Sequence, residues 1–359
     1  MNFQNFKEQF VEDVKRYLYE NGKEDVRIEV NQVDKMNQSY EAMTVVPEGS
    51  AIGINIPIKD YFKAYEDGIA YHNIVEKISA DIVEHIAKMP EIDLTFLRDY
   101  EKVKERLSIE VVSAERNAEQ LENVPHKLME DMAVVYRINI SLGHAEEGTV
   151  LVNNHLLESY GISPEQLHTD AEKNSAIIKP IILKGIGDVM RSMMSPEEAE
   201  LFGVDELEAD EILYVATVPD KIKGAGVLAY DGFMDYATQK LEGDFFVLPS
   251  SVHEILLVKD DGSMSYQELQ ALVKSVNATE VSPEDQLTNS VYHYDSKNKM
   301  FELAEKYEMR LNQEIAVGKA ERKSLIKNLN EKQAAVNEKA VVSKEIKKPS
   351  EKNRGGNEL

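Results

Sequence analysis

The chain has 359 residues, no cysteine and a net charge of −24. A chain of this length can bury one large core or two smaller ones, whereas the lack of cysteine excludes disulfides, thiolate metal ligands and cysteine nucleophiles. Glu8, Glu12 and Asp13 interrupt the region where a signal peptide needs continuous apolar residues, and no run of 18 apolar residues occurs. These features predict a soluble cytoplasmic protein without a membrane span.

The charge is distributed unevenly along the chain. Residues 1–302 carry 28 Lys and Arg against 56 Asp and Glu, a net charge of −28, whereas residues 303–359 carry 13 Lys and Arg against 9 Glu, a net charge of +4. An acidic surface repels the phosphate backbones of nucleic acids, so we expect residues 1–302, the acidic body of the chain, not to bind nucleic acid directly. Such a surface favours solubility, and it also suits a basic protein partner or mimicry of DNA.

The first 125 residues predict helices and a small antiparallel sheet. Phe6, Phe10 and Val14 recur at helical spacing in an opening helix that Asn21 and Gly22 end. Alternating apolar and polar residues predict a three-stranded meander, and further apolar stripes predict helices and one more strand. The expected elements are a helix over 3–20, strands over 26–30, 40–46 and 51–56, helices over 57–68, 71–89 and 95–105, a strand over 107–112, and a helix over 114–121 capped by Ser113.

Residues 126–300 predict strands interleaved with shorter helices. Asn153 or Asn154 can cap a helix that Gly161 ends, and Ser163 and Ser265 are N-caps of two further helices. Ser-Pro-Glu at 282–284 repeats the same type of helix start. The expected strands cover 132–142, 149–152, 212–218, 226–230, 245–248, 252–258 and 290–294, and the expected helices cover 155–160 and 231–241 and begin at 164, 266 and 283.

The mixed order of strands and helices favours an α+β fold with mixed, largely antiparallel sheets packed with helices. We expect an N-terminal α+β region over 1–125 and a C-terminal α+β region over 126–300, with the alternative that both form one continuous domain. Leu303, Tyr307, Leu311 and Ile315 form one helical stripe, after which apolar residues become sparse. Residues 301–359 are therefore expected to form a basic helix that frays into a disordered tail.

Several longer stretches of the chain are distinctive: MNFQNFKEQF, FLRDYEKVKERL with LENVPH, LVNNHLLESYGISPEQL, and LPSSVHEILLVKDDG with VNATEVSPEDQLTNSVYHYD. These stretches resemble those of a family of uncharacterised proteins from gut Firmicutes. The resemblance covers about residues 1–296, and the family is a domain of unknown function frequently encountered near mobile-element genes. It implies a bacterial cytoplasmic protein and assigns no catalytic residues.

The cluster at 250–254 is the first candidate site. Ser251 and His253 are two residues apart on an expected strand, so their side chains face the same side, as a hydroxyl nucleophile and its base require. Glu254 faces the opposite side and cannot orient His253, and Ser250 precedes the pair. Bonding of the hydroxyls to the backbone at a strand entry is the ordinary explanation of such a cluster.

The second candidate site is Asn153, Asn154 and His155, where a strand leads into a helix and exposed backbone N–H groups can bind an anion. Helix capping is the ordinary role of such residues. We expect no metal site, because the His-Glu pair at 253–254 lacks the second histidine of a zinc protease motif. No cofactor is expected either, because the glycine pairs at 185–187 and 224–226 lack the third glycine of a dinucleotide fingerprint and no phosphate-loop motif occurs.

Three functions follow from these features. The first is a non-enzymatic accessory protein, associated with mobile elements, that acts through protein–protein contact; it is favoured by the acidic body, the basic tail and the lack of a complete catalytic motif. The second is a hydrolase that uses Ser251 and His253 with residues from elsewhere in the fold. The third is an acidic mimic of DNA that binds a basic protein.

Overall fold

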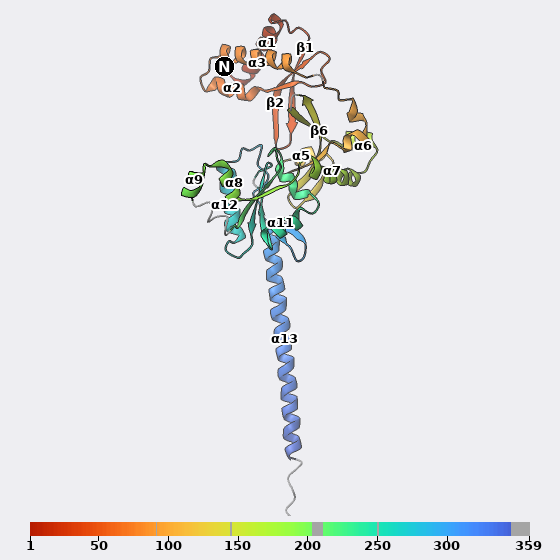
Figure 1. Cartoon of the computed structure of the whole chain (residues 1–359), viewed down its shortest axis with the longest axis vertical. Helices are drawn as coiled ribbons and strands as arrows, with labels where there is room; N and C mark the ends of the chain where they lie inside the picture. Colours follow the sequence, from red (N-terminus) through yellow and green to blue (C-terminus); the bar gives the residue numbers. More distant parts are fainter. Residues whose placement is uncertain (91, 144–145, 203–210, 250, 346–359) are drawn as a thin grey trace, which may run out of the picture. The chain divides into compact units, whose positions relative to one another are not determined.

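The computed structural model describes residues 1–359 except 91, 144–145, 203–210, 250 and 346–359 (Figure 1). The chain folds into two compact units, Met1–Leu303 and Ala304–Leu359. We describe each unit by itself and call the first one the body. The body is α+β and all strand pairs in its three sheets are antiparallel over the residues that the structure describes.

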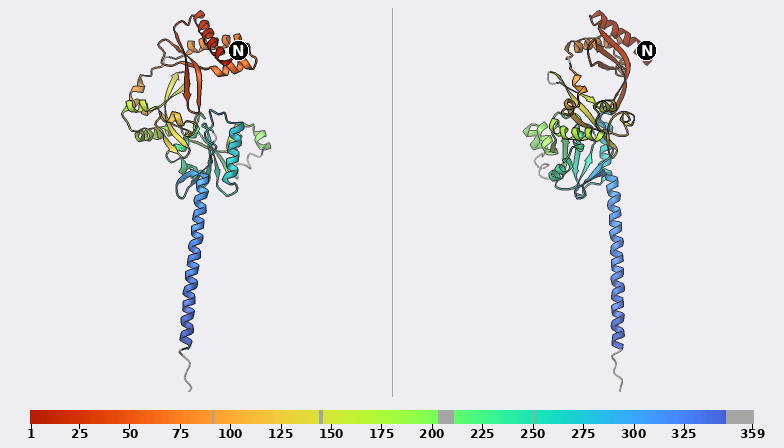
Figure 2. Two further views of the ribbon diagram at one scale, coloured as in Figure 1. Left: turned by 180° about the vertical axis from the view of Figure 1, so that it is seen from behind. Right: turned by 90° about the vertical axis from the view of Figure 1, so that its right-hand side faces the viewer.

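The N-terminal part of the body packs three helices beside a small sheet (Figures 1 and 2). Apolar residues at helical spacing on α1, with Phe6 and Phe10 fully buried, pack against Met43 and Val45 of the sheet and against Ile78 of the third helix. Burial of these side chains is the main stabilising contribution to this lobe. The elements are α1 (Phe3–Glu20), β1 (Val26–Lys35), β2 (Gln38–Pro47), β3 (Ile54–Pro57), α2 (Ile58–Glu66) and α3 (Tyr71–Lys88).

The β1–β2 hairpin connects this lobe to the rest of the body through its tip. Asn37 has φ +64°, a conformation that asparagine tolerates better than most residues. Its backbone N–H donates to Asn117 Oδ1 at 2.6 Å, and its Nδ2 donates to the backbone oxygens of Glu284 and Gln286. Met36, beside it, is buried in a separate apolar cluster that includes residues 112, 121 and 133. The tip therefore connects three segments that are distant in sequence.

A four-stranded sheet forms the centre of the body. Strand β4 is buried at every residue because α7 and the 3-10 helix η2 both pack against it. Ser175 on α7 supports this packing, since its hydroxyl accepts the Ile109 N–H at 2.8 Å. The elements are η1 (Thr95–Arg98), α4 (Tyr100–Lys104), β4 (Leu107–Ser113), α5 (Ala118–Leu121), β5 (Lys127–Met129), β6 (Met132–Gly143), β7 (Glu146–Leu151), α6 (Asn154–Tyr160) and α7 (Pro164–Ile178).

A six-stranded sheet completes the body, with strand order β13-β12-β10-β11-β9-β8. Its central strand β10 is buried at all four residues, and α12 packs against it. Ser265 and Glu268 form a capping box at the start of α12. The elements are β8 (Ile182–Gly185), α8 (Ile186–Met193), α9 (Pro196–Leu201), β9 (Leu213–Thr217), η2 (Gly224–Ala229), α11 (Phe233–Leu241), β10 (Phe245–Leu248), β11 (Ile255–Lys259), α12 (Tyr266–Thr279), β12 (Tyr292–Asp295) and β13 (Met300–Leu303).

The second unit contains one long helix, α13 (Ala304–Glu345). Its exposed apolar side chains include Leu311, Ile315, Leu325 and Leu329. The helix expected at the start of the tail is confirmed, whereas residues 346–359, for which we expected disorder, lie outside the described residues. No helix among the described residues is long and apolar enough to cross a membrane.

The predicted α+β class and most predicted elements are confirmed, but four local predictions are wrong. The strand expected over 226–230 is the helix η2, and the strand expected from 252 begins at Ile255. Residues 282–285 form a turn rather than a helix start, and Asn117, not Ser113, precedes the short helix α5. These segments are short and contact several elements, so tertiary packing overrides their local preferences. Strand β4 pairs with β6, so one sheet spans the expected division near residue 125.

Candidate functional site

The predicted pair Ser251 and His253 lies in the connection before β11, held by backbone contacts. The His253 N–H donates to Ser251 Oγ at 3.1 Å, and the Lys223 N–H donates to His253 Nδ1 at 3.3 Å. His253 Nε2 lies 3.0 Å from Asp285 Oδ1. Because Nδ1 accepts a hydrogen bond, neutral His253 carries its proton on Nε2 and donates it to Asp285. Both ring nitrogens are engaged, so neither is available to accept a proton from Ser251; Ser250 lies outside the described residues.

The second predicted cluster fixes the start of α6. Asn153 Oδ1 accepts the Leu156 N–H at 2.9 Å, as an N-cap does. Asn154 donates its Nδ2 to the Glu122 oxygen at 3.1 Å, and His155 is exposed. Among the described residues, no hydrogen bond joins this cluster to the Ser251–His253 segment. The structure therefore does not bring the two predicted clusters together through direct contacts.

A buried ion cluster lies next to His253. Glu110 on β4 is 3 % exposed and contacts the Arg137 guanidinium on β6 and Lys223 Nζ, the latter at 2.7 Å. Burial alone would raise the pKa of Glu110, but the two cations hold it below its ordinary value. Burial lowers the pKa of Lys223, and the Glu110 charge opposes this shift only in part. The cluster fixes the chain just before η2.

Two glycines allow η2 to pack closely on the strands. A Cβ on Gly224 would lie 2.2 Å from Thr217 Oγ1 and 2.3 Å from the His253 oxygen, and a Cβ on Gly226 would lie 2.8 Å from the Ile109 oxygen. Only glycine fits such approaches. The glycine pair that lacks a dinucleotide fingerprint therefore has a packing role, and it positions the residues that follow η2.

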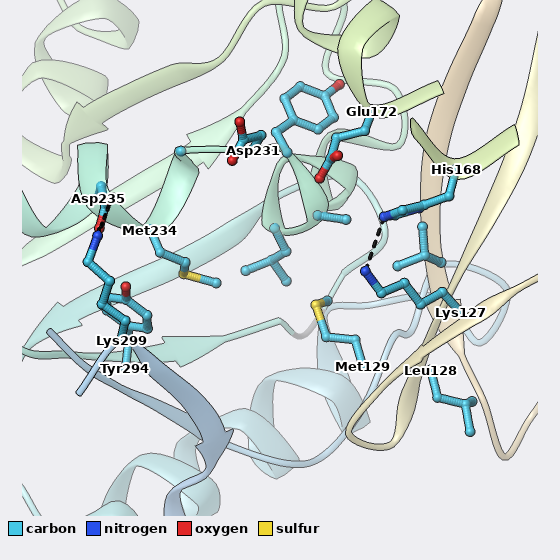
Figure 3. Close-up of a pocket in the computed structure, with 15 residues that line it drawn as sticks. Lys127, Leu128, Met129, His168, Glu172, Asp231, Met234, Asp235, Tyr294 and Lys299 are labelled. Atoms are coloured by element: carbon cyan, nitrogen blue, oxygen red, sulfur yellow. Dashed lines mark hydrogen bonds and ion pairs between the residues drawn. The ribbon is translucent and has the colours of Figure 1, made fainter. Parts of the chain in front are cut away.

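A pocket of about 360 Å³ opens between β5, α7 and the segment from η2 to α11 (Figure 3). We call it the Lys127–His168 pocket. Its floor is apolar and its rim carries charged groups, the combination that ligand sites commonly show. The lining residues are Lys127, Leu128, Met129, Val134, His168, Glu172, Leu228, Ala229, Tyr230, Asp231, Gly232, Met234, Asp235, Tyr294 and Lys299.

At one end of the pocket, the lining residues Lys127 and His168 form a chain of polar groups with Tyr136, which does not itself line the pocket. Lys127 Nζ lies 3.2 Å from His168 Nε2, and His168 Nδ1 lies 3.0 Å from the Tyr136 hydroxyl. An ammonium group can only donate, so Nε2 accepts and the proton of neutral His168 is on Nδ1, directed at Tyr136. Burial and the Lys127 charge lower the pKa of His168, and burial also raises the pKa of Tyr136. Near neutral pH, His168 is therefore an uncharged group that holds the Lys127 ammonium at the rim.

Two carboxylates lie beside this chain of groups. Glu172 is half-buried on α7, and Asp231 is exposed just after η2; Figure 3 shows both on one side of the pocket. Burial and the Asp231 charge raise the pKa of Glu172, although Lys127 opposes the shift. At the far end, Lys299 Nζ contacts both carboxylate oxygens of Asp235, at 2.8 and 3.1 Å. The pocket thus has more carboxylates than ammonium groups around its apolar floor.

Sequence reasoning did not single out the residues of this pocket. His168 and Glu172 are one turn apart on α7, beside the buried stripe of Leu167, Ala171 and Ser175. Two ionisable groups next to the apolar face of a helix are a usable signal for a partly buried site. Lys127, which approaches from strand β5, has no comparable signal because its proximity to α7 arises only from folding. Within the described residues, no group of three or more His, Asp or Glu could hold a metal ion.

Comparison with family models identifies the chain as a member of a family of unknown function, DUF5688, whose model matches residues 3–296. The match covers nearly all of the body and stops before α13. Comparison with curated proteins finds no match, and comparison with solved structures finds none either.

Proposed function

We propose that this member of a family without an assigned activity is a cytoplasmic, non-enzymatic accessory protein whose body binds a basic partner protein. In this proposal, a side chain of the partner enters the Lys127–His168 pocket. The observation that carries the proposal is the pocket itself, in which apolar residues such as Met129 and Met234 lie below charged groups. Protein interfaces typically combine an apolar centre with a polar rim in this way.

Two features of the body support a basic protein as the partner. Residues 1–302 carry a net charge of −28, which attracts a basic surface and increases the rate of encounter. Leu128 lies at the rim of the pocket with 62 % of its surface exposed, so it offers an apolar contact next to the charged groups. A partner that covers Leu128 would bury this surface on binding.

Site-specific photocrosslinking tests the proposal. We would place p-benzoylphenylalanine at position 128 of the full chain and irradiate it in a lysate of cells that naturally express the protein. The matched control places the same group at position 272, because Leu272 on α12 is also exposed but does not line the pocket. We expect one basic protein to crosslink from position 128 only, with a yield that falls as salt is added. Equal labelling from both positions, or labelling that salt does not reduce, would contradict the proposal.

A further inference from the structure

The charges that line the Lys127–His168 pocket do not balance. Lys299 and Asp235 neutralise one another through their bidentate contact. The remaining charged groups are one cation, Lys127, and two carboxylates, Glu172 and Asp231. The pocket therefore holds one negative charge in excess when both carboxylates are ionised.

Lys127 does not neutralise either carboxylate by direct contact. Its ammonium donates to His168 Nε2, and among the described residues it forms no ion pair with Glu172 or Asp231. Glu172 accepts no hydrogen bond from any described residue, although its side chain is half-buried. The pKa of Glu172 is raised because burial and the neighbouring Asp231 charge disfavour its ionised form. A half-buried carboxyl without a partner is a group that a ligand can complete.

The surface next to the two carboxylates is apolar and adaptable. Leu228 and Ala229 at the end of η2 and Met234 at the start of α11 line the pocket close to Asp231 in sequence, and Met129 faces them from β5. Methionine side chains adjust their shape to different aliphatic groups. An alkyl chain that carries a positive charge at its end therefore matches both the apolar floor and the uncompensated carboxylates.

We propose that the Lys127–His168 pocket contains a subsite for a primary alkylammonium group, which Glu172 and Asp231 bind while Met129, Leu228 and Met234 contact its alkyl chain. The inference deepens the proposed function and rests on it for the use of this pocket. The same chemistry is present in a lysine side chain of a partner protein and in a free alkyl diamine. A neutral group of the same length lacks the positive charge that the two carboxylates attract, so it should bind more weakly.

Calorimetric titration of the full chain tests the subsite with defined probes. One arm uses Nα-acetyl-lysine methylamide and the other uses 1,5-diaminopentane; the matched neutral probe is the lysine derivative with its ε-amine acetylated. We expect the charged probes to bind and the neutral probe to bind at least about tenfold more weakly, the factor that corresponds to losing a hydrogen bond between charged groups. Tighter binding of the lysine derivative identifies a polypeptide as the source, and tighter binding of the diamine identifies a free amine.

Variants locate the subsite. Glu172→Gln and Asp231→Asn should each weaken binding of the preferred charged probe by about tenfold. Glu158→Gln is the control, because Glu158 is an exposed carboxylate on α6 that does not line the pocket, and it should leave binding unchanged. The melting temperature of Glu172→Gln should not fall, since the substitution removes a charge that the folded state disfavours. This measurement separates a lost subsite from a lost fold.

Three results would overturn the inference: no binding of the charged probes, equal binding of the charged and neutral probes, or unchanged binding of the charged probes to both pocket variants. The proposed function can fail separately. If the charged probes bind but no partner crosslinks from position 128, the subsite holds and the partner proposal fails. If a partner crosslinks from position 128 but the charged probes do not bind, the partner proposal holds and the subsite inference fails.

Discussion

Replacing Glu110 with Gln tests whether the buried ion cluster stabilises the packing of η2 on the central sheet. Glu110 is 3 % exposed and contacts Arg137 and Lys223, so the substitution leaves two cations without their shared anion. Breaking a buried ion pair costs about 3–5 kcal/mol. Because 26 % of the Lys223 side chain is exposed, its ammonium can regain part of its hydration. We therefore expect the free energy of unfolding to fall by about 3 kcal/mol, at the lower end of the range.

Urea unfolding at pH 7, followed by circular dichroism, measures this loss. Glu41→Gln is the matched control, because Glu41 pairs with Lys7 at 3.0 Å while both side chains keep between a fifth and a third of their surface exposed. Such an accessible pair contributes less than about 1 kcal/mol. A loss for Glu110→Gln no larger than that for Glu41→Gln would refute the reasoning that burial makes this cluster important.

The pH dependence of the same variant gives a second check. The pKa of Glu110 is lower in the folded chain than its ordinary value of 4.5, because Arg137 and Lys223 outweigh the effect of burial. Because the pKa of Glu110 is lowered by folding, the stability that its ionised form contributes is complete above pH 4.5. This contribution is lost as the pH falls through the pKa that Glu110 has in the folded chain. The difference in unfolding free energy between the native chain and Glu110→Gln should therefore narrow under acidic conditions; a constant difference would contradict the assignment.

Three further predictions concern other parts of the body. Gly224→Ala should lower the free energy of unfolding by about 1–3 kcal/mol in urea titrations, because the new methyl group has no space beside Thr217; an unchanged midpoint would contradict this packing. Asn37→Ala should speed amide hydrogen exchange at residues 282–287, because its side chain donates to the backbone oxygens of Glu284 and Gln286; exchange rates equal to those of the native chain would show that the hairpin tip does not stabilise this segment. Lys127→Gln should raise the NMR-measured pKa of His168 toward its ordinary value, because the Lys127 charge is one cause of the lowered pKa, whereas an unchanged titration would exclude that cause.

Local sequence patterns predicted the elements that depend on contacts within a single segment. The stripe of Phe6, Phe10 and Val14 indicates α1 because one face of a helix is buried over its whole length. Ser163 and Ser265 mark the starts of α7 and α12, since a cap bonds only to the next few residues. Such signals do not depend on the rest of the fold, and they also support the α+β class.

The segments that were predicted incorrectly depend on long-range contacts. Residues 226–230 have the composition of a strand, but the ion cluster before η2 and the close approach of Gly226 to Ile109 favour a 3-10 helix. Ser251 and His253 were expected on one strand, yet backbone contacts with the segments that contain Lys223 and Asp285 determine their positions. No pattern within a short window contains this information.

The sequence by itself determined the main helices, the antiparallel character of the sheets and the strongly acidic charge of the body, because these properties follow from the spacing and composition of neighbouring residues. The tertiary structure decided where polar groups converge. It places Lys127 of β5, His168 and Glu172 of α7, and Asp231 after η2 around one apolar floor, although more than 100 residues separate the first from the last. Such a pocket depends on strand pairing and helix packing across the whole body, which local residue patterns do not specify.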